Sequence, residues 1–230
     1  MFRIKICGIT TAADALCAAR AGADAIGLNF CAASKRRVDL ERAQEIIAAL
    51  PGHVVKVGVF ADADAEQVAE IARRLSFDAL QLHGHETPAD LAALRDYRLI
   101  KAFGCGPHGH LAVIDFVAQC ERLGFRPAMV LLDAASAAGV GSPTGGTGRL
   151  ADWVAATSYR DQPAMPPLVL AGGLTAENVG QAIRHVRPAA VDTASGVELS
   201  PGFKDHEKVG RFIAAAQKAM QNDARDNAEL

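Results

Sequence analysis

Two residues that could exchange protons stand at the ends of apolar segments of this chain. Cys7 ends the first apolar run, within FRIKICGIT, and Asp133 ends a later one, AMVLLD. If both runs are parallel strands of one sheet or barrel, the thiol and the carboxyl group face each other across a single mouth. The pattern therefore predicts an acid/base pair.

Three glycine-rich segments follow the later apolar runs, at residues 139–148, 171–175 and 193–198. Glycine lets the backbone approach a ligand closely, and amide groups exposed before a helix suit a phosphate dianion. Taken alone, AGGLT also fits an ordinary turn with Thr175 as helix N-cap. Two such loops at one rim favour a phosphate site, with four candidate residues: Gly172, Gly173, Ser195 and Gly196.

The elements that must position these residues alternate regularly. Eight short apolar runs rich in β-branched residues predict strands, and each is followed by an Ala-rich segment with helical periodicity. The predicted strands are 2–7, 25–30, 54–60, 79–83, 99–103, 128–133, 168–171 and 189–193. The predicted helices are 11–21, 40–50, 65–75, 88–95, 111–122, a short one near 151, 176–186 and 207–220.

This order indicates an α/β protein, a single (β/α)8 TIM barrel. The continuous apolar strands are typical of parallel strands covered by helices, and 230 residues suit one such domain. A doubly wound open sheet is the alternative, but the first strand lacks the glycine fingerprint of dinucleotide-binding proteins. We expect the barrel to span residues 1–220, with a disordered polar tail at 221–230.

Charge and cysteine content limit the classes of binding partner and the cellular location that the sequence favours. The net charge of -2 favours a small-molecule partner over nucleic acid or a membrane, and no run of 18 apolar residues occurs. The five cysteines are widely spaced and include no C-x-x-C pair, which argues against a disulfide framework or zinc site. No signal-peptide pattern opens the chain. We predict a cytoplasmic protein.

Several motifs in order resemble the phosphoribosylanthranilate isomerase family of tryptophan biosynthesis. They are KICGIT (5–10), SKRRV (34–38), VGVF (57–60), LQLHGHE (80–86), LLDA (131–134), GGTG (145–148), LAGGL (170–174) and VDTASGVE (191–198). The resemblance runs almost end to end. It implies an Amadori rearrangement of a small phosphorylated substrate, without cofactor or metal, with Cys7 as base and Asp133 as acid.

The resemblance also extends to substrate-binding positions. It gives Arg36 the role of holding the anthranilate carboxylate, which a planar guanidinium can do with two parallel hydrogen bonds. His83 is a candidate pocket residue, with a packed neutral histidine as the alternative. Asp192 is either an active-site residue or an acceptor for backbone amides. The chain could act as a monomer or a homodimer.

The sequence departs from the family pattern in two loops. The residues before Arg36 read CAAS, where the family commonly has a proline before the Ser-Lys-Arg. After GGTG, Arg149, Leu150 and Ala151 replace the usual lysine and aromatic residue. The long segment 134–148 suits a lid over the substrate.

Three other functions are compatible with the pattern. A metal-dependent sugar-phosphate epimerase would use His83 and His85, whose i, i+2 spacing on an extended segment puts both imidazoles on one side. A non-catalytic phosphate-binding barrel would need only the loops. The related isomerase of histidine synthesis uses two aspartates, so Cys7 argues against it.

Overall fold

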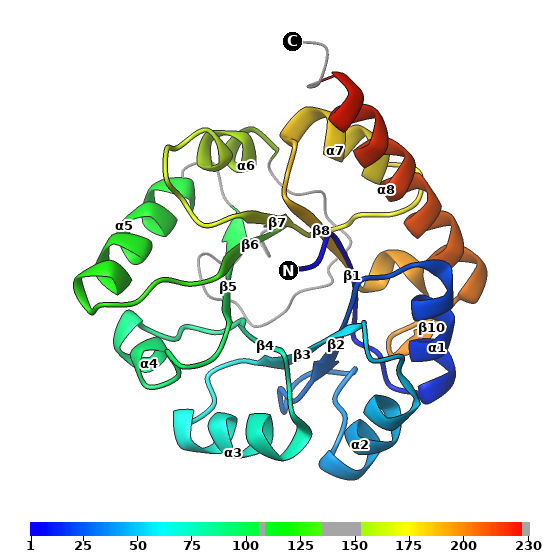
Figure 1. Ribbon diagram of the computed structural model, residues 1–230, viewed down its shortest axis with the longest axis horizontal. Helices are drawn as coiled ribbons and strands as arrows, with labels where there is room; N and C mark the ends of the chain where they lie inside the picture. The colour runs from blue at the N-terminus through cyan, green and yellow to red at the C-terminus, as the bar shows by residue number, and fades with distance from the viewer. Residues whose placement is uncertain (106–108, 135–152, 227–230) are drawn as a thin grey trace.

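The strands form the expected closed barrel. The computed structural model describes residues 1–105, 109–134 and 153–226, and within them eight parallel strands pair in chain order from β1 to β8, which pairs with β1 (Figure 1). They are β1 (Ile4–Cys7), β2 (Ala25–Asn29), β3 (Val55–Phe60), β4 (Ala79–Leu82), β5 (Leu99–Cys105), β6 (Met129–Ala134), β7 (Leu168–Leu170) and β8 (Ala190–Thr193). The predicted (β/α)8 barrel is confirmed.

Helices surround the barrel, one after each strand (Figure 1). They are α1 (Ala12–Ala21), α2 (Leu40–Ala49), α3 (Ala65–Leu75), α4 (Pro88–Ala92), α5 (Gly109–Arg122), α6 (Trp153–Arg160), α7 (Val179–Val186) and α8 (His206–Asp226). Local sequence sets many ends: the side chains of Thr11, Asp39 and Asp64 cap α1, α2 and α3. Gly22, with φ 101°, ends α1 in the left-handed region.

Side chains alternate between the two faces of each strand, and this alternation places the chemistry. On β1, Ile4 and Ile6 pack outward against the helices, which leaves Lys5 and Cys7 on the inner face. On β4, Leu80 and Leu82 likewise face the helices. The polar residues of these strands therefore enter the barrel interior among small apolar side chains.

Two local features differ from the sequence-based expectations. Helix α7 begins at Val179 rather than 176. Thr175 caps the turn before it, because its hydroxyl accepts from the Glu177 amide and its own amide donates to Asn178 Oδ1. Helix α8 continues to Asp226, past the predicted boundary at 220, since the segment QNDARD contains no helix-breaking residue. Residues 227–230 lie outside the described part of the chain.

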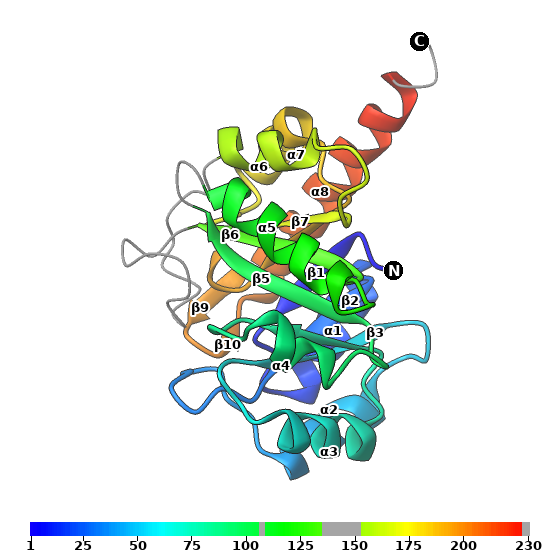
Figure 2. The same ribbon diagram turned by 90° about the vertical axis from the view of Figure 1, so that its left-hand side faces the viewer.

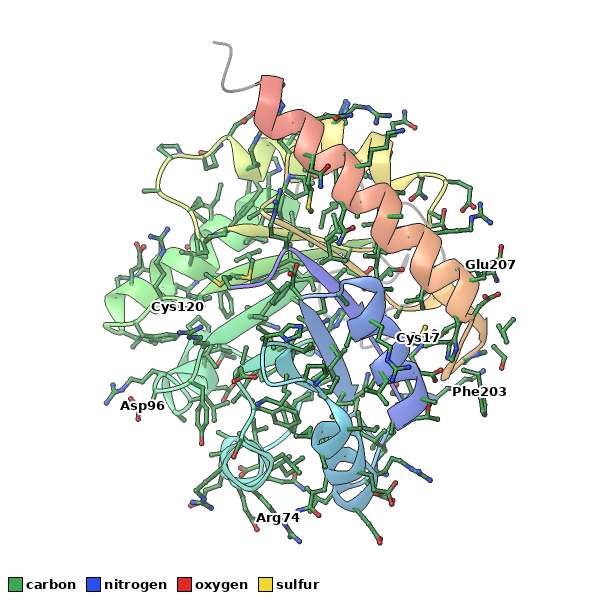
Figure 3. All side chains as sticks on the ribbon, turned by 45° about the vertical axis from the view of Figure 1, so that its right-hand side comes forward. Cys17, Arg74, Asp96, Cys120, Phe203 and Glu207 are labelled. Atoms are coloured by element: carbon green, nitrogen blue, oxygen red, sulfur yellow. The ribbon has the colours of Figure 1, made fainter. Side chains whose placement is uncertain are left out.

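A short 3-10 helix and a hairpin follow β8 and were not predicted. They are η1 (Ser195–Val197), β9 (Glu198–Ser200) and β10 (Phe203–Lys204). Figure 2 shows the hairpin at the end of the barrel opposite the N-terminus, which is the end to which the strands point. Figure 3 shows Phe203 at the outer edge of the molecule. Of the helices described, none is long and apolar enough to span a membrane.

Candidate active site

A pocket of about 340 Å³ opens at the carboxyl ends of the strands. Eight of the nine residues predicted from the sequence line it: Cys7, Arg36, His83, Asp133, Gly172, Gly173, Asp192 and Ser195. Gly196 lies in η1 next to Ser195 and is not among the lining residues. The volume falls within the range of small-molecule sites.

Cys7 shares the inner face of β1 with a buried ion pair. The Lys5 ammonium lies 2.9 Å from Asp192 Oδ1 on the neighbouring strand β8, and its positive charge acts on the Cys7 thiol. Gly27 on β2 makes room for both, because a Cβ there would lie 2.8 Å from Cys7 Sγ and 3.2 Å from Lys5 Cε. The thiol is thus fixed beside a cation.

The two members of this cluster respond differently to burial. Burial raises the pKa of the Cys7 thiol, and the favourable charge of Lys5 offsets only part of that effect. Burial lowers the pKa of Lys5, but Asp192 and Cys7 outweigh it and the net shift is upward. Lys5 therefore remains a cation, while Cys7 is largely a neutral thiol at pH 7 in the free protein.

Asp133 faces His83 across the mouth between β6 and β4. His83 Nε2 lies 3.5 Å from Asp133 Oδ2, and the other ring nitrogen, Nδ1, lies 3.2 Å from the Gln81 amide nitrogen. Burial, with smaller contributions from Lys101 and Lys5, lowers the pKa of His83 to about 4. His83 is consequently neutral at physiological pH and joins Asp133 as a hydrogen-bonding group rather than a charge.

A second buried lysine supports the loop that carries His83. Lys101 of β5 donates to the carbonyl groups of Leu82 and Gly84 and lies 2.8 Å from Glu86 Oε2. Glu86 in turn accepts from the amide of Gly84 at 2.9 Å. These contacts lie on the outer side of the barrel wall and fix the loop after β4 without entering the pocket.

Arg36 is held by a carboxylate that sequence reasoning did not assign. Its Nε and Nη2 each lie 2.8 Å from an oxygen of Glu198, and Lys204 Nζ lies 2.8 Å from Glu198 Oε1. Lys204 also donates to the carbonyl of Ala194, at the start of the predicted phosphate loop. One buried carboxylate between two cations leaves a net positive charge at the pocket, which favours an anion there.

The predicted phosphate loops are shaped by backbone requirements. Gly172 and Gly173 have φ values of 90° and 65°, in the region that L side chains rarely adopt. Asn178 fixes this loop by donating to the Gly173 carbonyl and accepting from the Thr175 amide. A Cβ on Gly196 would collide with the Leu174 carbonyl, so Gly196 allows the two loops to pack together.

The two histidines of the LQLHGHE motif do not share a side. His83 points to Gln81 and Asp133, whereas the exposed His85 contacts Asp62. The expectation of two imidazoles on one side is wrong, because β4 ends at Leu82 and the chain is no longer extended through Gly84. Within residues 1–105, 109–134 and 153–226, no group of three His, Cys, Asp or Glu side chains is arranged to hold a metal.

Comparison with known proteins agrees with this geometry. The family model described as "N-(5'phosphoribosyl)anthranilate (PRA) isomerase" matches residues 4–215. The chain belongs to this family. The N-(5'-phosphoribosyl)anthranilate isomerase of Acidithiobacillus ferrooxidans is 46% identical over 222 residues, which cover 93% of this chain and 97% of that protein.

Solved structures of the phosphoribosylanthranilate isomerase family have the same barrel. The enzyme from Thermotoga maritima is 38% identical, with a TM-score of 0.82, over 95% of this chain and 100% of that one. A second structure, in complex with reduced 1-(o-carboxyphenylamino)-1-deoxyribulose 5-phosphate, is 36% identical, with a TM-score of 0.79 and the same coverage.

The residues at this family's pocket that escaped the sequence-based assignment include Lys5, Gln81, Glu198 and Lys204, which contact predicted site residues or their loops. Two of them had a usable signal, since Lys5 and Gln81 stand two residues before Cys7 and His83 and share their inward faces. Glu198 contacts Arg36, and Lys204 contacts Glu198, only because the hairpin of β9 and β10 brings them there. The predicted lid at 134–148, including GGTG, and the departure at 149–151 fall almost wholly on 135–152, outside the described residues.

Proposed function

We propose that Cys7 and Asp133 are the base and acid of an Amadori rearrangement. The reaction converts N-(5-phosphoribosyl)anthranilate into 1-(2-carboxyphenylamino)-1-deoxyribulose 5-phosphate, in tryptophan biosynthesis. One observation carries the assignment of roles. The thiol and the carboxyl group are both less than a tenth exposed, and they line one pocket from strands that are not neighbours.

The chemistry needs two proton transfers. Asp133 in its protonated form gives a proton to the furanose ring oxygen, the bond from C1 to that oxygen breaks, and a protonated Schiff base forms at C1. The Cys7 thiolate then takes the proton from C2, the electron pair of that C–H bond becomes the double bond between C1 and C2, and the π pair of the C1–N double bond moves to the nitrogen. The resulting enol tautomerises to the ketone product. Over the two steps Asp133 loses one proton and Cys7 gains one, so the charges balance without an external oxidant or reductant.

The raised pKa of Cys7 sets a condition on this mechanism. The thiolate is the minor form at neutral pH in the free protein. The positive charge of Lys5 is the largest influence that favours it. A base with a high pKa is a strong one once formed, which suits removal of a proton from carbon. We therefore expect kcat to increase from pH 7 to pH 9, as the thiolate fraction grows.

The remaining pocket residues recognise the two anionic ends of the substrate. Arg36 receives the anthranilate carboxylate, with Glu198 holding the guanidinium in place. The loops of Gly172, Gly173, Ser195 and Gly196 receive the phosphate through backbone amides. His83 and Asp192 bound the space between the two anions, where the sugar must lie.

The proposed setting follows from the same chemistry. Cys7 must stay reduced, which supports a cytoplasmic location. The partner is a small phosphorylated molecule, and no cofactor or metal takes part in either proton transfer. Either a monomer or a homodimer is compatible with this proposal.

The deciding experiment mixes purified protein with freshly made phosphoribosylanthranilate in the presence of a chelator. Loss of anthranilate fluorescence faster than spontaneous hydrolysis, with formation of the carboxyphenylamino-deoxyribulose phosphate, is the expected result. Activity that needs an added divalent ion would instead indicate the metal-dependent epimerase chemistry. No turnover under any condition would indicate a non-catalytic phosphate-binding barrel.

A further inference from the structure

Gln81 is a polar residue in an apolar layer of the barrel interior. It is 1% exposed, and the layer around it includes Val59, Ala79 and Ala102. Its Nε2 lies 3.2 Å from His83 Nδ1, whereas its Oε1 is buried and has no hydrogen-bond partner among the described residues. Burying an amide with one unsatisfied group costs stability that a leucine or valine would not cost. Packing alone does not account for this residue.

The contact defines the protonation of His83. An amide N–H donates, so Nδ1 accepts, and the single proton of the neutral ring is on Nε2. That nitrogen is the one that lies 3.5 Å from Asp133 Oδ2. The carboxyl group of Asp133 is the ionisable group beside the ring, and two cations, Lys101 on β5 and Lys5 on β1, oppose a second proton on His83.

We propose that Gln81 is a positioning residue for the acid, because its amide holds His83 in the tautomer whose Nε2–H faces Asp133. The proposal rests on the proposed function, in which Asp133 gives its proton to the ring oxygen. Once the proton has left, the carboxylate needs a hydrogen-bond donor, and His83 supplies one already in place. A donor fixed before the reaction stabilises developing charge without reorganisation.

A neutral donor suits this task better than a cation. A protonated His83 would stabilise the Asp133 carboxylate before the reaction as well, and it would hold the acid in its deprotonated form. A neutral Nε2–H acts most strongly when the negative charge appears. Gln81 can orient the ring without adding charge, which neither glutamate nor lysine at this position could do.

Two substitutions of nearly equal size separate the roles of Gln81. Gln81→Met removes the amide but keeps the volume, and Gln81→Glu replaces the donor with a carboxylate, which accepts a hydrogen bond and therefore favours a proton on Nδ1. The first readout is the 15N spectrum of the His83 ring at pH 7, assigned by its loss in His83→Asn. We expect wild-type protein to show a proton on Nε2 alone and Gln81→Glu to show a protonated Nδ1.

The second readout separates kcat from binding. We expect kcat to fall about 10-fold in Gln81→Met and about 100-fold in Gln81→Glu, within the range of a lost acid–base contribution. Binding of the reduced product analogue, measured by titration calorimetry, should change less than 3-fold in Gln81→Met, since the acid has no proton to transfer to it. A merely structural role predicts parallel losses in kcat and binding.

Three results would overturn the proposal: a proton on Nδ1 of wild-type His83, an unprotonated Nδ1 in Gln81→Glu, or an unchanged kcat in that variant. The spectra need no turnover, so they test the tautomer even if the variants are inactive. Failure of the proposed function looks different, because wild-type protein would then show no isomerase activity while the spectra could still be as expected.

Discussion

The two sides of the barrel mouth are built from opposite kinds of contact. The side formed by β8, β1 and β2 is charged, with the Lys5–Asp192 pair and the Glu198 carboxylate between Arg36 and Lys204. The side formed by β4 and β6 presents two neutral groups, the Gln81 amide and the His83 ring, next to Asp133. The fixed charges of the first side favour anions there and act on Cys7, whereas the ring next to Asp133 on the second side adds no charge of its own.

The two buried lysines show how the barrel wall maintains this difference. Lys5 points inward to Cys7 and Asp192, and its pKa is raised. Lys101 lies on the outer side of β5, and its pKa is lowered by burial despite the neighbouring Glu86. The first lysine acts on the pocket directly. The second supports a loop and reaches the pocket only through its field on His83.

The largest expected effects come from removing one proton-transfer group on each side. Cys7→Ala and Asp133→Asn should each lower kcat by about 10²- to 10⁴-fold with little change in KM, because each removes a transition-state proton transfer. Steady-state kinetics measures both constants. Cys17→Ala is the control, since Cys17 lies on α1, away from the pocket (Figure 3). A rise in KM alone would assign either residue to binding.

The charged side can be broken at its buried pair. Lys5→Met leaves Asp192 buried without its cation, and we expect the free energy of unfolding to fall by about 3–5 kcal/mol. Urea denaturation measures the change. Adding Asp192→Asn to that variant should restore part of the loss, because the unpaired charge is then gone. If Lys5→Met were as stable as wild type, the ion pair would not be what stabilises this side.

The sequence was sufficient for the barrel and for most of the pocket. Cys7, Asp133 and His83 could be placed because parallel strands point their ends at one rim, so position along each strand determined position in space. Its position at the end of a strand also placed Asp192 at the rim. Whether it is an active-site residue or an acceptor for backbone amides could not be decided from the sequence, which does not show that its partner is Lys5. The two lie 187 residues apart in the chain and 2.9 Å apart in space.

Contacts made by irregular segments could not be predicted in this way. Glu198 and Lys204 belong to a hairpin whose two strands have three and two residues. These strands are too short to show a periodic pattern in the sequence. The charge state of Cys7 was also inaccessible, since it depends on the balance between burial and Lys5. Such balances depend on distances, which a sequence of residue types does not contain.

The cluster of Arg36, Glu198 and Lys204 gives a sharper test of what the charged side recognises. Arg36→Met should raise KM about 10- to 100-fold with a smaller change in kcat, because it removes a bidentate carboxylate contact. Glu198→Gln should raise KM about 10-fold, because the guanidinium loses its preorganised orientation. The matched control is a substrate with aniline in place of anthranilate. Equal effects on both substrates would mean that the cluster does not read the carboxylate.

His83, on the neutral side, predicts a pH dependence of stability between pH 7 and pH 5. His83 has a pKa of about 4 in the folded protein, lowered by burial and then by Lys101 and Lys5, against an unfolded value near 6.5. Between these values the unfolded chain binds a proton that the folded one does not, so stability falls as the pH falls. The expected loss is about 2 kcal/mol between pH 7 and pH 5.

Urea denaturation at the two pH values measures this loss, and His83→Asn provides the comparison. The variant lacks the titrating ring, so its free energy of unfolding should fall by about 2 kcal/mol less than that of wild type. The Lys5–Asp192 pair is common to both proteins and cancels in the difference. Equal losses in the two proteins would mean that His83 gains a proton in the folded state. The ring next to Asp133 would then be charged, not neutral, at pH 5.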